Sequence, residues 1–414
     1  RAPSETDDEF NVAEFGELPM WYKGRSMPID SFANNSLLRL ADYESYRDAE
    51  GEKHSATEWV LSLMADEEKA RDARIFKIEN KEVIEALGLE DRKRFTYSFN
   101  ELLHSDKIDG IKEMGMLTIL RGLEGLTEID SNKPREFDIA ASETPEAERS
   151  LFQRKIIELS RKIDDYVLFE FTLGNARIVD LMKDQSEAPE GTPAIAELAF
   201  KLREFNRLHK QAFRDLPIAL VVPTHLNAGK RPENEVFQTE WESVAASKIF
   251  NEIYSEMEAI DTEDEFNKPP AISEFISLLN AYKAGEVETF NKNLKEYRAL
   301  LNDYEHEKED ANLLTKTKFE AVYNRFGAFN LASWLYVFAG ILGSLGWLFF
   351  PQIFQRAAFW TIATVFVIHT AALLGRIYIS GRPPVTNLYS SAIFIGWAVV
   401  LGSLILEKIS KLGA

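Results

Sequence analysis

Three long apolar runs near the end of the chain constrain its fold more than any other feature. Leu331–Phe350 has 20 consecutive residues without a charge, about the number that a helix needs to cross the core of a bilayer. Ala357–Gly375 and Leu388–Leu406 are also free of charge and long enough to span. We therefore predict transmembrane helices at about residues 331–350, 357–379 and 388–407. A buried hairpin of a large soluble protein is the alternative, but three such runs in one stretch rarely stay soluble.

Charge divides the chain at the same point. The 414 residues include 67 acidic and 48 basic side chains, which gives a net charge of −19. Residues 331–414 carry a net charge of +4, whereas the preceding 330 residues carry −23. An acidic surface argues against a general nucleic-acid binder, because phosphate contacts need basic side chains. The absence of cysteine excludes disulfides, thiolate metal sites and cysteine nucleophiles.

Residues 1–330 are predicted to form two soluble domains, a mixed α/β domain at 1–143 and a helical domain at 144–330. In the second domain apolar residues recur every three or four positions, as on an amphipathic helix. The helices predicted there are 152–166, 195–205, 237–257, 272–282 and 290–304, and the run 218–222 is either a strand or an extended crossing. In the first domain we predict a helix at 55–72, a strand at 73–78 and a helix at 81–87. The predicted fold class is mainly α: an α-rich soluble region with minor β structure, followed by a transmembrane bundle of at least three helices.

Known catalytic signatures are absent from the sequence. It contains no glycine-rich phosphate loop, no His-Glu-x-x-His pair, no Gly-x-Ser-x-Gly elbow and no acidic calcium loop. Neighbouring carboxylates such as Asp164-Asp165 or Glu67-Glu68 do not share a helix face, and an acidic chain yields such pairs by chance. Catalytic residues therefore stay unknown, and no metal site is predicted.

His369 is the residue for which the sequence best supports a function, because it is the thirteenth residue of the second apolar run. A polar side chain at that depth needs a partner, and intramembrane ionisable residues are functional candidates. His369 either contacts a cofactor or takes part in proton transfer, or it forms an interhelical hydrogen bond that only fixes packing. The other histidines are interpreted as a core residue (His209), as solvated (His54, His104, His306) or left open (His225).

A resemblance to a known family rests on the residues around the third run. The loop GRPPVTNLY at 381–389 makes a stiff connector in which Asn387 could cap the next helix. The string RIYISGRPPVTNLYSSAIFIGWAVVLGSLILE at 376–407 resembles the opening membrane helices of the CcsA/ResC family of system II cytochrome c biogenesis. The matching positions are Arg376, Gly381, Arg382, Pro384, Asn387 and Tyr389, whereas Ser390 stands where the family has Glu.

Two further strings extend the resemblance to the large CcsB-CcsA fusion-type proteins. KFEAVYNRFGAFNLASWLY at 318–336 is similar to the segment by which they enter the membrane. YKGRSMPIDSFANNSLLRL at 22–40 resembles one of their extracytoplasmic strings, with matches at Gly24, Arg25, Pro28, Asp30, Phe32 and Ala33.

The resemblance implies a membrane component that handles or delivers haem for covalent attachment to apocytochrome c outside the cytoplasm. Haem is the implied cofactor, and His369, although it matches no ligand of the family motif, is the candidate residue for contact with it. The implied partners are apocytochrome c, other cytochrome c biogenesis components and membrane lipid, with no nucleic acid. The implied location is the bacterial inner membrane, with residues 1–330 on the periplasmic side.

The sequence also departs from the family. The tryptophan-rich haem-binding motif and its flanking histidines have no counterpart before Ala414. The resemblance is therefore to the N-terminal portion of such a protein, and a cytochrome c synthetase (haem lyase) would need that motif beyond this chain or on another one. The alternative function is a membrane-anchored sensor or scaffold whose helical domain binds a protein partner. A transporter would need more polar residues in the helices than this sequence has.

Overall fold

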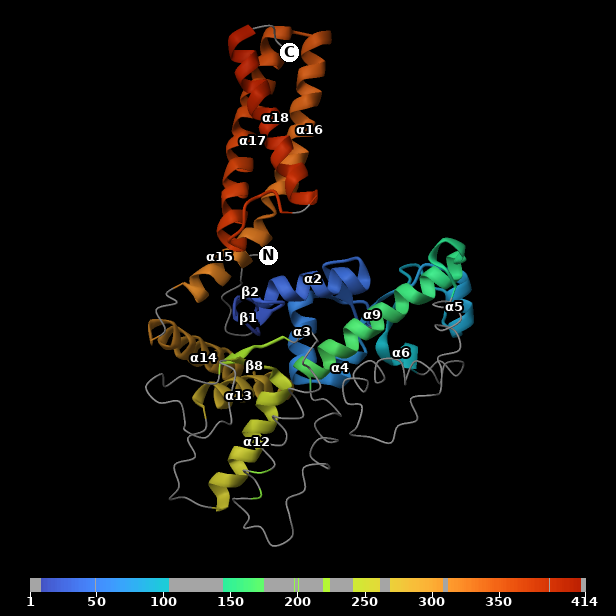
Figure 1. Ribbon diagram of the computed structural model, residues 1–414, viewed down its shortest axis with the longest axis vertical. Helices are drawn as coiled ribbons and strands as arrows, with labels where there is room; N and C mark the ends of the chain where they lie inside the picture. The colour runs from blue at the N-terminus through green and yellow to red at the C-terminus, as the bar shows by residue number, and fades with distance from the viewer. Residues whose placement is uncertain are drawn as a thin grey trace. The chain divides into compact units, whose positions relative to one another are not determined.

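The computed structural model describes residues 9–48, 50–103, 144–174, 197, 200, 219–223, 241–260, 269–307, 312–386 and 388–410. The chain divides into two compact units, an N-terminal unit at Arg1–Thr317 and a C-terminal unit at Lys318–Ala414. Figure 1 shows the described elements of both units, with labels where there is room.

The N-terminal unit starts with a short helix and a β-hairpin. The side chain of Asn11 caps α1 (Val12–Gly16). Strands β1 (Pro19–Tyr22) and β2 (Arg25–Pro28) pair antiparallel, and the two residues between them, Lys23 and Gly24, both have positive φ angles. This backbone conformation matches the twist of a tight hairpin. The chain then enters α2 (Ile29–Ala41) directly after Pro28.

A four-stranded antiparallel sheet follows, in the order β4-β3-β5-β6. Its strands are β3 (Ser45–Arg47), β4 (Lys53–Ser55), β5 (Arg74–Lys77) and β6 (Thr96–Ser98). The helices between and after them are α3 (Ala56–Ala65), α4 (Glu67–Arg71), α5 (Lys81–Leu87) and α6 (Phe99–Leu103). Ser55 and Glu58 form a capping box that fixes the start of α3 at the end of β4.

Long helices complete the N-terminal unit. They are α9 (Leu151–Leu173), α12 (Val244–Ile260), α13 (Pro270–Ala284) and α14 (Val287–Glu307), together with the 3₁₀ turn Glu146–Glu148. The short strands β7 (Val222–Pro223) and β8 (Trp241–Glu242) pair with each other, and Leu220 bridges to Trp21 of the first hairpin. One cluster of buried apolar side chains joins these helices to the sheet, with Trp59 of α3 stacked on Tyr166 of α9. α3 contacts both α9 and α13, so it lies at the centre of this core.

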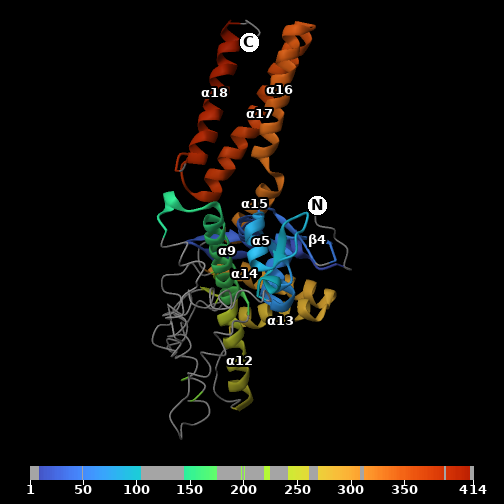
Figure 2. The ribbon, with the colours of Figure 1, turned by 90° about the vertical axis from the view of Figure 1, so that its right-hand side faces the viewer.

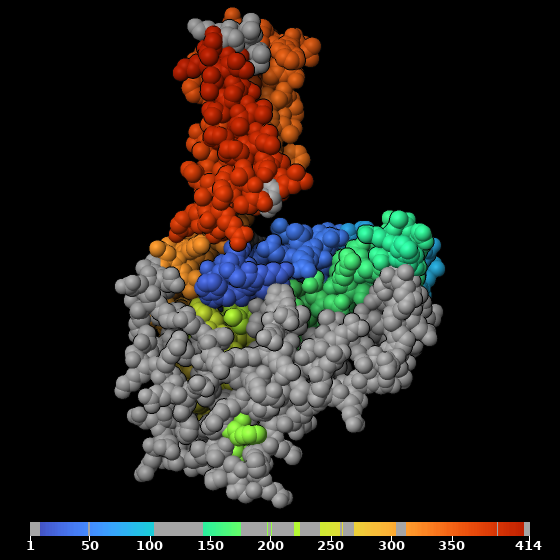
Figure 3. All heavy atoms as spheres, in the orientation of Figure 1, coloured from blue at the N-terminus to red at the C-terminus, as the bar shows by residue number. Residues whose placement is uncertain are grey.

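The C-terminal unit is a helical bundle. α15 (Leu313–Phe326) leads into it, and α16 (Ala328–Leu348), α17 (Pro351–Ser380) and α18 (Leu388–Ser410) follow. Both ribbon views show these last three helices running alongside one another, and α17 packs against both α16 and α18 (Figures 1 and 2). In the space-filling view they form one packed column (Figure 3). Three segments, Leu313–Leu348, Pro351–Ser380 and Leu388–Ile409, are long and apolar enough to cross a membrane.

The predicted fold class is therefore confirmed, and many element predictions hold. α5 has the predicted bounds and ends at Gly88 in the left-handed conformation. The spacing-based helices reappear as α9, α13 and α14, and the strand predicted at 73–78 is β5. The helix predicted at 195–205 lies outside the described residues, apart from positions 197 and 200.

Other predictions were wrong in their limits. The helix predicted at 55–72 breaks at Asp66, whose φ of −145° and ψ of 90° are extended, so that α3 and α4 are separate helices. The helix predicted at 237–257 starts only at Val244, because Trp241 and Glu242 pair with β7. The hairpin β1–β2 and α2 were not predicted, since their short apolar segments give no clear periodicity.

Candidate functional site

His369 lies on the face of α17 that is buried within the C-terminal unit. Helix residues seven apart share a face, and Val365, Ala358 and Ala372 are buried along this one. Only 7% of His369 is exposed. The small side chains let α16 approach α17 closely, which encloses the imidazole between the two helices.

Two aromatic side chains of α16 surround the imidazole; together with it they form what we call the His369 cluster. The Tyr336 hydroxyl lies 3.4 Å from Nδ1, and the Phe329 ring meets the imidazole edge-on with its centroid 5.8 Å away. Nε2 is buried and has no hydrogen-bond partner among the described residues. A buried polar atom without a partner is costly and calls for an explanation.

The chemistry of this cluster depends on which ring nitrogen carries the proton. If Nδ1–H donates to the Tyr336 oxygen, then the lone pair of Nε2 is free to accept a bond from a metal or a proton donor. Such a second contact, on the nitrogen that does not bind metal, is the usual way in which a ligating histidine is oriented. The His369 cluster can therefore hold an iron ligand or a proton acceptor.

Arg376 joins the end of α17 to the start of α18. Its guanidinium donates to the Ser390 hydroxyl at 3.3 Å and stacks over the Tyr389 ring, 5.3 Å from the centroid. These contacts bring together two matching positions of the resemblance, Arg376 and Tyr389, and they make Ser390, where the family has Glu, the hydrogen-bond acceptor. We interpret these contacts as a structural link between α17 and α18 rather than as a reactive site.

Trp397 lies in the middle of the third apolar run, where an interfacial tryptophan is not expected. Its indole N–H donates to the Thr370 hydroxyl at 2.9 Å, and its ring stacks on Phe366 and Phe394. The sequence could have indicated this contact, because the indole N–H of a tryptophan that lies away from water usually needs a hydrogen-bond acceptor.

The loop positions of the resemblance have structural roles. Gly381 ends α17 with a φ of +63°, and its N–H donates to the Ile377 carbonyl. Arg382 is exposed and its N–H donates to the Ser380 hydroxyl, while Pro384 is half-buried. Asn387, predicted to cap α18, lies outside the described residues.

The matching positions near the beginning of the chain lie in the N-terminal unit and shape its first hairpin. Gly24 has a φ of +76° in the turn, and Arg25 opens β2. Pro28 precedes α2, and Asp30 in its first turn accepts a bond from the Thr57 hydroxyl at 2.9 Å. Phe32 and Ala33 are buried in the core. Each of these positions therefore has a role in the structure of the hairpin, of α2 or of the core.

Two polar groups of the N-terminal unit were missed at the sequence level. His54, interpreted as solvated, is half-buried: its Nε2 lies 2.8 Å from Asp48 Oδ2, and this hydrogen bond lowers the pKa of Asp48. Glu67, regarded as one of a chance pair, is mostly buried near Arg71 and Glu170. The register of β3 and β4 sets His54 opposite Tyr46, two residues before Asp48, but strands of three residues are too short to detect by pattern. The histidines 104, 209 and 225, and the side chain of His306, are outside the described residues.

Comparison with known proteins gives a similarity over part of the chain. The chain is 31% identical over 111 residues to Protein NrfI of Wolinella succinogenes. That stretch covers 25% of this chain and 12% of NrfI, so the chain matches a small part of that protein's length. No family profile matches the chain, and no solved structure matches it.

Proposed function

We propose that this chain is a membrane component of cytochrome c biogenesis that handles or delivers haem for attachment to apocytochrome c outside the cytoplasm. The similarity to NrfI supports a role in cytochrome c biogenesis in general. The string at 376–407 supports the finer assignment to system II, and the three membrane-spanning candidates suit a protein that works in the bilayer.

The observation that carries the haem part of the proposal is the unpartnered Nε2 of His369. A neutral imidazole with a free lone pair is the usual axial ligand of haem iron. Burial within apolar helices would exclude water from such a bond, and the aromatic rings of Phe329 and Tyr336 offer flat surfaces for a porphyrin. The unpartnered Nε2 is the feature of the His369 cluster that suits haem, which when bound would supply the iron porphyrin that is passed on.

Tyr336 has the second role in this proposal. Its hydroxyl lies within reach of Nδ1, so in this role it would accept a hydrogen bond from Nδ1–H, which leaves the lone pair on Nε2. Arg376, with Ser390 and Tyr389, holds α18 against the end of α17. Residues 1–330 would face the periplasm, where apocytochrome c is the partner.

The test is an absorption spectrum of the full chain, purified in detergent from bacteria supplied with a haem precursor. We expect a Soret band in the parent protein. We expect His369→Gly to lose that band and added imidazole to restore it, because imidazole can occupy the space of the deleted side chain. Tyr336→Phe keeps the ligand but loses its orienting partner, so we expect about tenfold weaker haem binding.

His54→Gln in the N-terminal unit is the matched control, since it removes a histidine outside the bundle and should keep the band. A parent protein without a Soret band, or a His369→Gly protein with an unchanged one, would contradict the role of His369. Co-purification from membranes addresses the function itself. Apocytochrome c or other biogenesis components should accompany the chain, whereas a sensor or scaffold would bring neither.

A further inference from the structure

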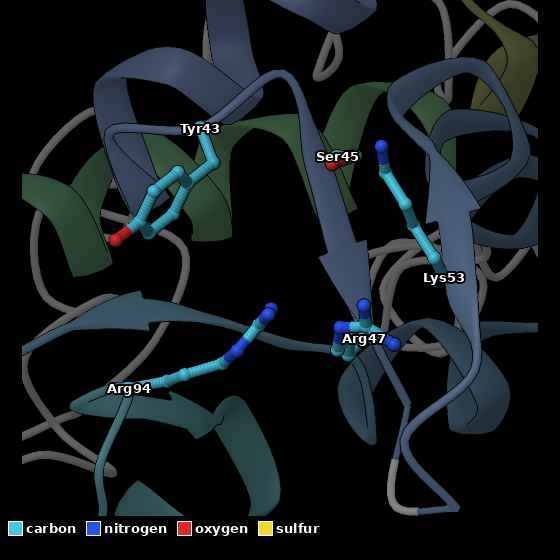
Figure 4. A pocket seen from close by; sticks show the side chains of 5 residues that line it. All are labelled: Tyr43, Ser45, Arg47, Lys53 and Arg94. Atoms are coloured by element: carbon cyan, nitrogen blue, oxygen red, sulfur yellow. The ribbon is translucent and has the colours of Figure 1, made fainter.

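The solvent face of the four-stranded sheet carries a pocket of about 310 Å³ with a strongly basic lining. Five residues line it: Tyr43, Ser45, Arg47, Lys53 and Arg94. Tyr46, which alternates with Ser45 and Arg47 along β3, is buried, so the pocket lies on the opposite face of the strand from the core. Figure 4 shows Arg94 extending from its loop into the space between Tyr43 and the strands.

The sheet register sets basic side chains directly opposite one another at this pocket. Arg47 of β3 pairs with Lys53 of β4 on one side and with Arg74 of β5 on the other. Like charges directly opposite in a sheet repel each other and destabilise it. Negative charge near these basic side chains would offset their mutual repulsion and stabilise the sheet.

Only part of that charge comes from the described residues of the chain. Arg74 lies 3.6 Å from a Glu101 oxygen, and Arg92, two residues before Arg94, is paired with Glu90 and Glu101. In contrast, no carboxylate of the described residues lies within 4.0 Å of the charged groups of Arg47, Lys53 or Arg94. Three cations around one pocket with no carboxylate partner among the described residues stand out in a chain with 67 acidic residues.

The side chains are also arranged to bind an anion. Arg47 donates from one nitrogen to the Gly51 carbonyl, which fixes its guanidinium and leaves its other donors free. A tight turn sets the place of Arg94: the N–H of Phe95 donates to the Arg92 carbonyl, and Phe95 has a positive φ. The Ser45 hydroxyl adds a neutral donor to the pocket.

We propose that this pocket binds a phosphate group. Three cations reach it from two strands and a loop, so a tetrahedral dianion with oxygens in several directions matches them better than a single planar carboxylate. The group could belong to a free phosphate or to a lipid headgroup, and these two sources share the chemistry that the pocket recognises. All residues of the site lie in the N-terminal unit, so the proposal does not depend on haem.

Equilibrium dialysis with labelled inorganic phosphate tests the site on the full chain in phosphatidylcholine nanodiscs. We expect saturable uptake of one phosphate per chain, weakened by added salt because the partners are exposed. The double variant Arg47→Gln and Arg94→Gln removes two of the cations, and we expect at least about tenfold weaker binding. The control is Lys292→Gln with Lys295→Gln, which removes the same charge from exposed positions of α14.

The outcomes separate clearly. Uptake that falls in the Arg47/Arg94 variant but not in the control supports the site. No saturable uptake, or the same affinity in both double variants, overturns it. Nanodiscs that contain phosphatidylglycerol distinguish the two sources: competition with labelled phosphate indicates a lipid headgroup, and unchanged uptake indicates a free phosphate.

Discussion

The two units of the chain bury opposite kinds of side chain. In the N-terminal unit the largest fully buried residues are aromatic or aliphatic, among them Trp59, Phe275 and Phe290. In the C-terminal unit the buried residues of α16 and α17 are mostly small, as Ala339, Gly346 and Ala372 are, with His369 among them. The large apolar side chains of that unit are exposed instead, including Trp334, Trp347 and Leu388.

This difference indicates the solvent of each unit. Water drives large apolar side chains into a core, whereas lipid is as apolar as leucine and gives no such force. Helices in lipid associate through close approach of small residues and through a few polar contacts, such as those of His369, Trp397 and Arg376. The C-terminal unit thus has the packing of a membrane bundle as well as the composition of one.

The largest expected effect is that of a core truncation compared with a lipid-facing one. Phe275 is fully buried against Phe15 and Tyr297, so we expect Phe275→Ala to destabilise the N-terminal unit by about 3–5 kcal/mol. Phe338 of α16 is 52% exposed, and detergent surrounds it whether the bundle is folded or not, so Phe338→Ala should change stability by only about 0.5 kcal/mol. Pulse proteolysis in urea measures the first variant, and SDS titration of the bundle measures the second. Equal losses of stability in the two variants would contradict the proposal that water surrounds the N-terminal unit and lipid surrounds the C-terminal unit.

A second prediction concerns the close approach of helices within the bundle. A Cβ on Gly375 would lie 2.9 Å from a Tyr323 ring carbon, whereas a Cβ on Gly340 would meet no atom within 4 Å. We expect Gly375→Ala to cost about 1–3 kcal/mol by overpacking. Gly340→Ala should be neutral or stabilise the helix by up to about 1 kcal/mol. SDS titration of both variants checks the difference, and a Gly375→Ala protein as stable as its parent would mean that this contact does not hold the bundle together.

The sequence predicted the membrane helices well for the same physical reason. A run without charges is decisive, because each charge at the bilayer centre is costly. The helix limits depend on features that a run does not reveal: α17 starts at Pro351, six residues before the predicted start at 357, because proline is tolerated in the first turn of a helix. The imidazole of His369 was expected to need a partner, but only packing against α16 identifies Tyr336 as that partner.

The soluble unit was less predictable. Long amphipathic helices such as α9 and α14 follow from their spacing, whereas strands of three residues such as β3 and β4 carry too few positions for a period of two. The basic pocket depends on the register that sets Arg47 opposite Lys53 and Arg74, and register is a long-range property of the sheet. No local pattern in the sequence therefore pointed to that site.

The smallest expected effect concerns buried charge, which the N-terminal unit contains near Glu67. Burial, reinforced by the charge of Glu170, raises the pKa of Glu67 to about 7 from its ordinary value of 4.5. The folded state therefore holds this proton to a higher pH than the unfolded state does. Stability from this group is present below about pH 4.5 and is lost as the pH rises to about 7.

Glu67→Gln removes this titration, so the variant should gain stability on its parent as the pH rises from 5 to 7.5, by on the order of 1–2 kcal/mol. Burial also lowers the pKa of Lys248 to about 8, so measurements above that pH would mix two titrations. Urea unfolding of the N-terminal unit at a series of pH values provides the measurement. Glu68→Gln is the matched control, because it makes the same change of side chain at a neighbouring position that is 78% exposed. If both variants kept the parent's profile, the burial of Glu67 would have no thermodynamic consequence, and the charged groups around it would be as well solvated as those on the surface.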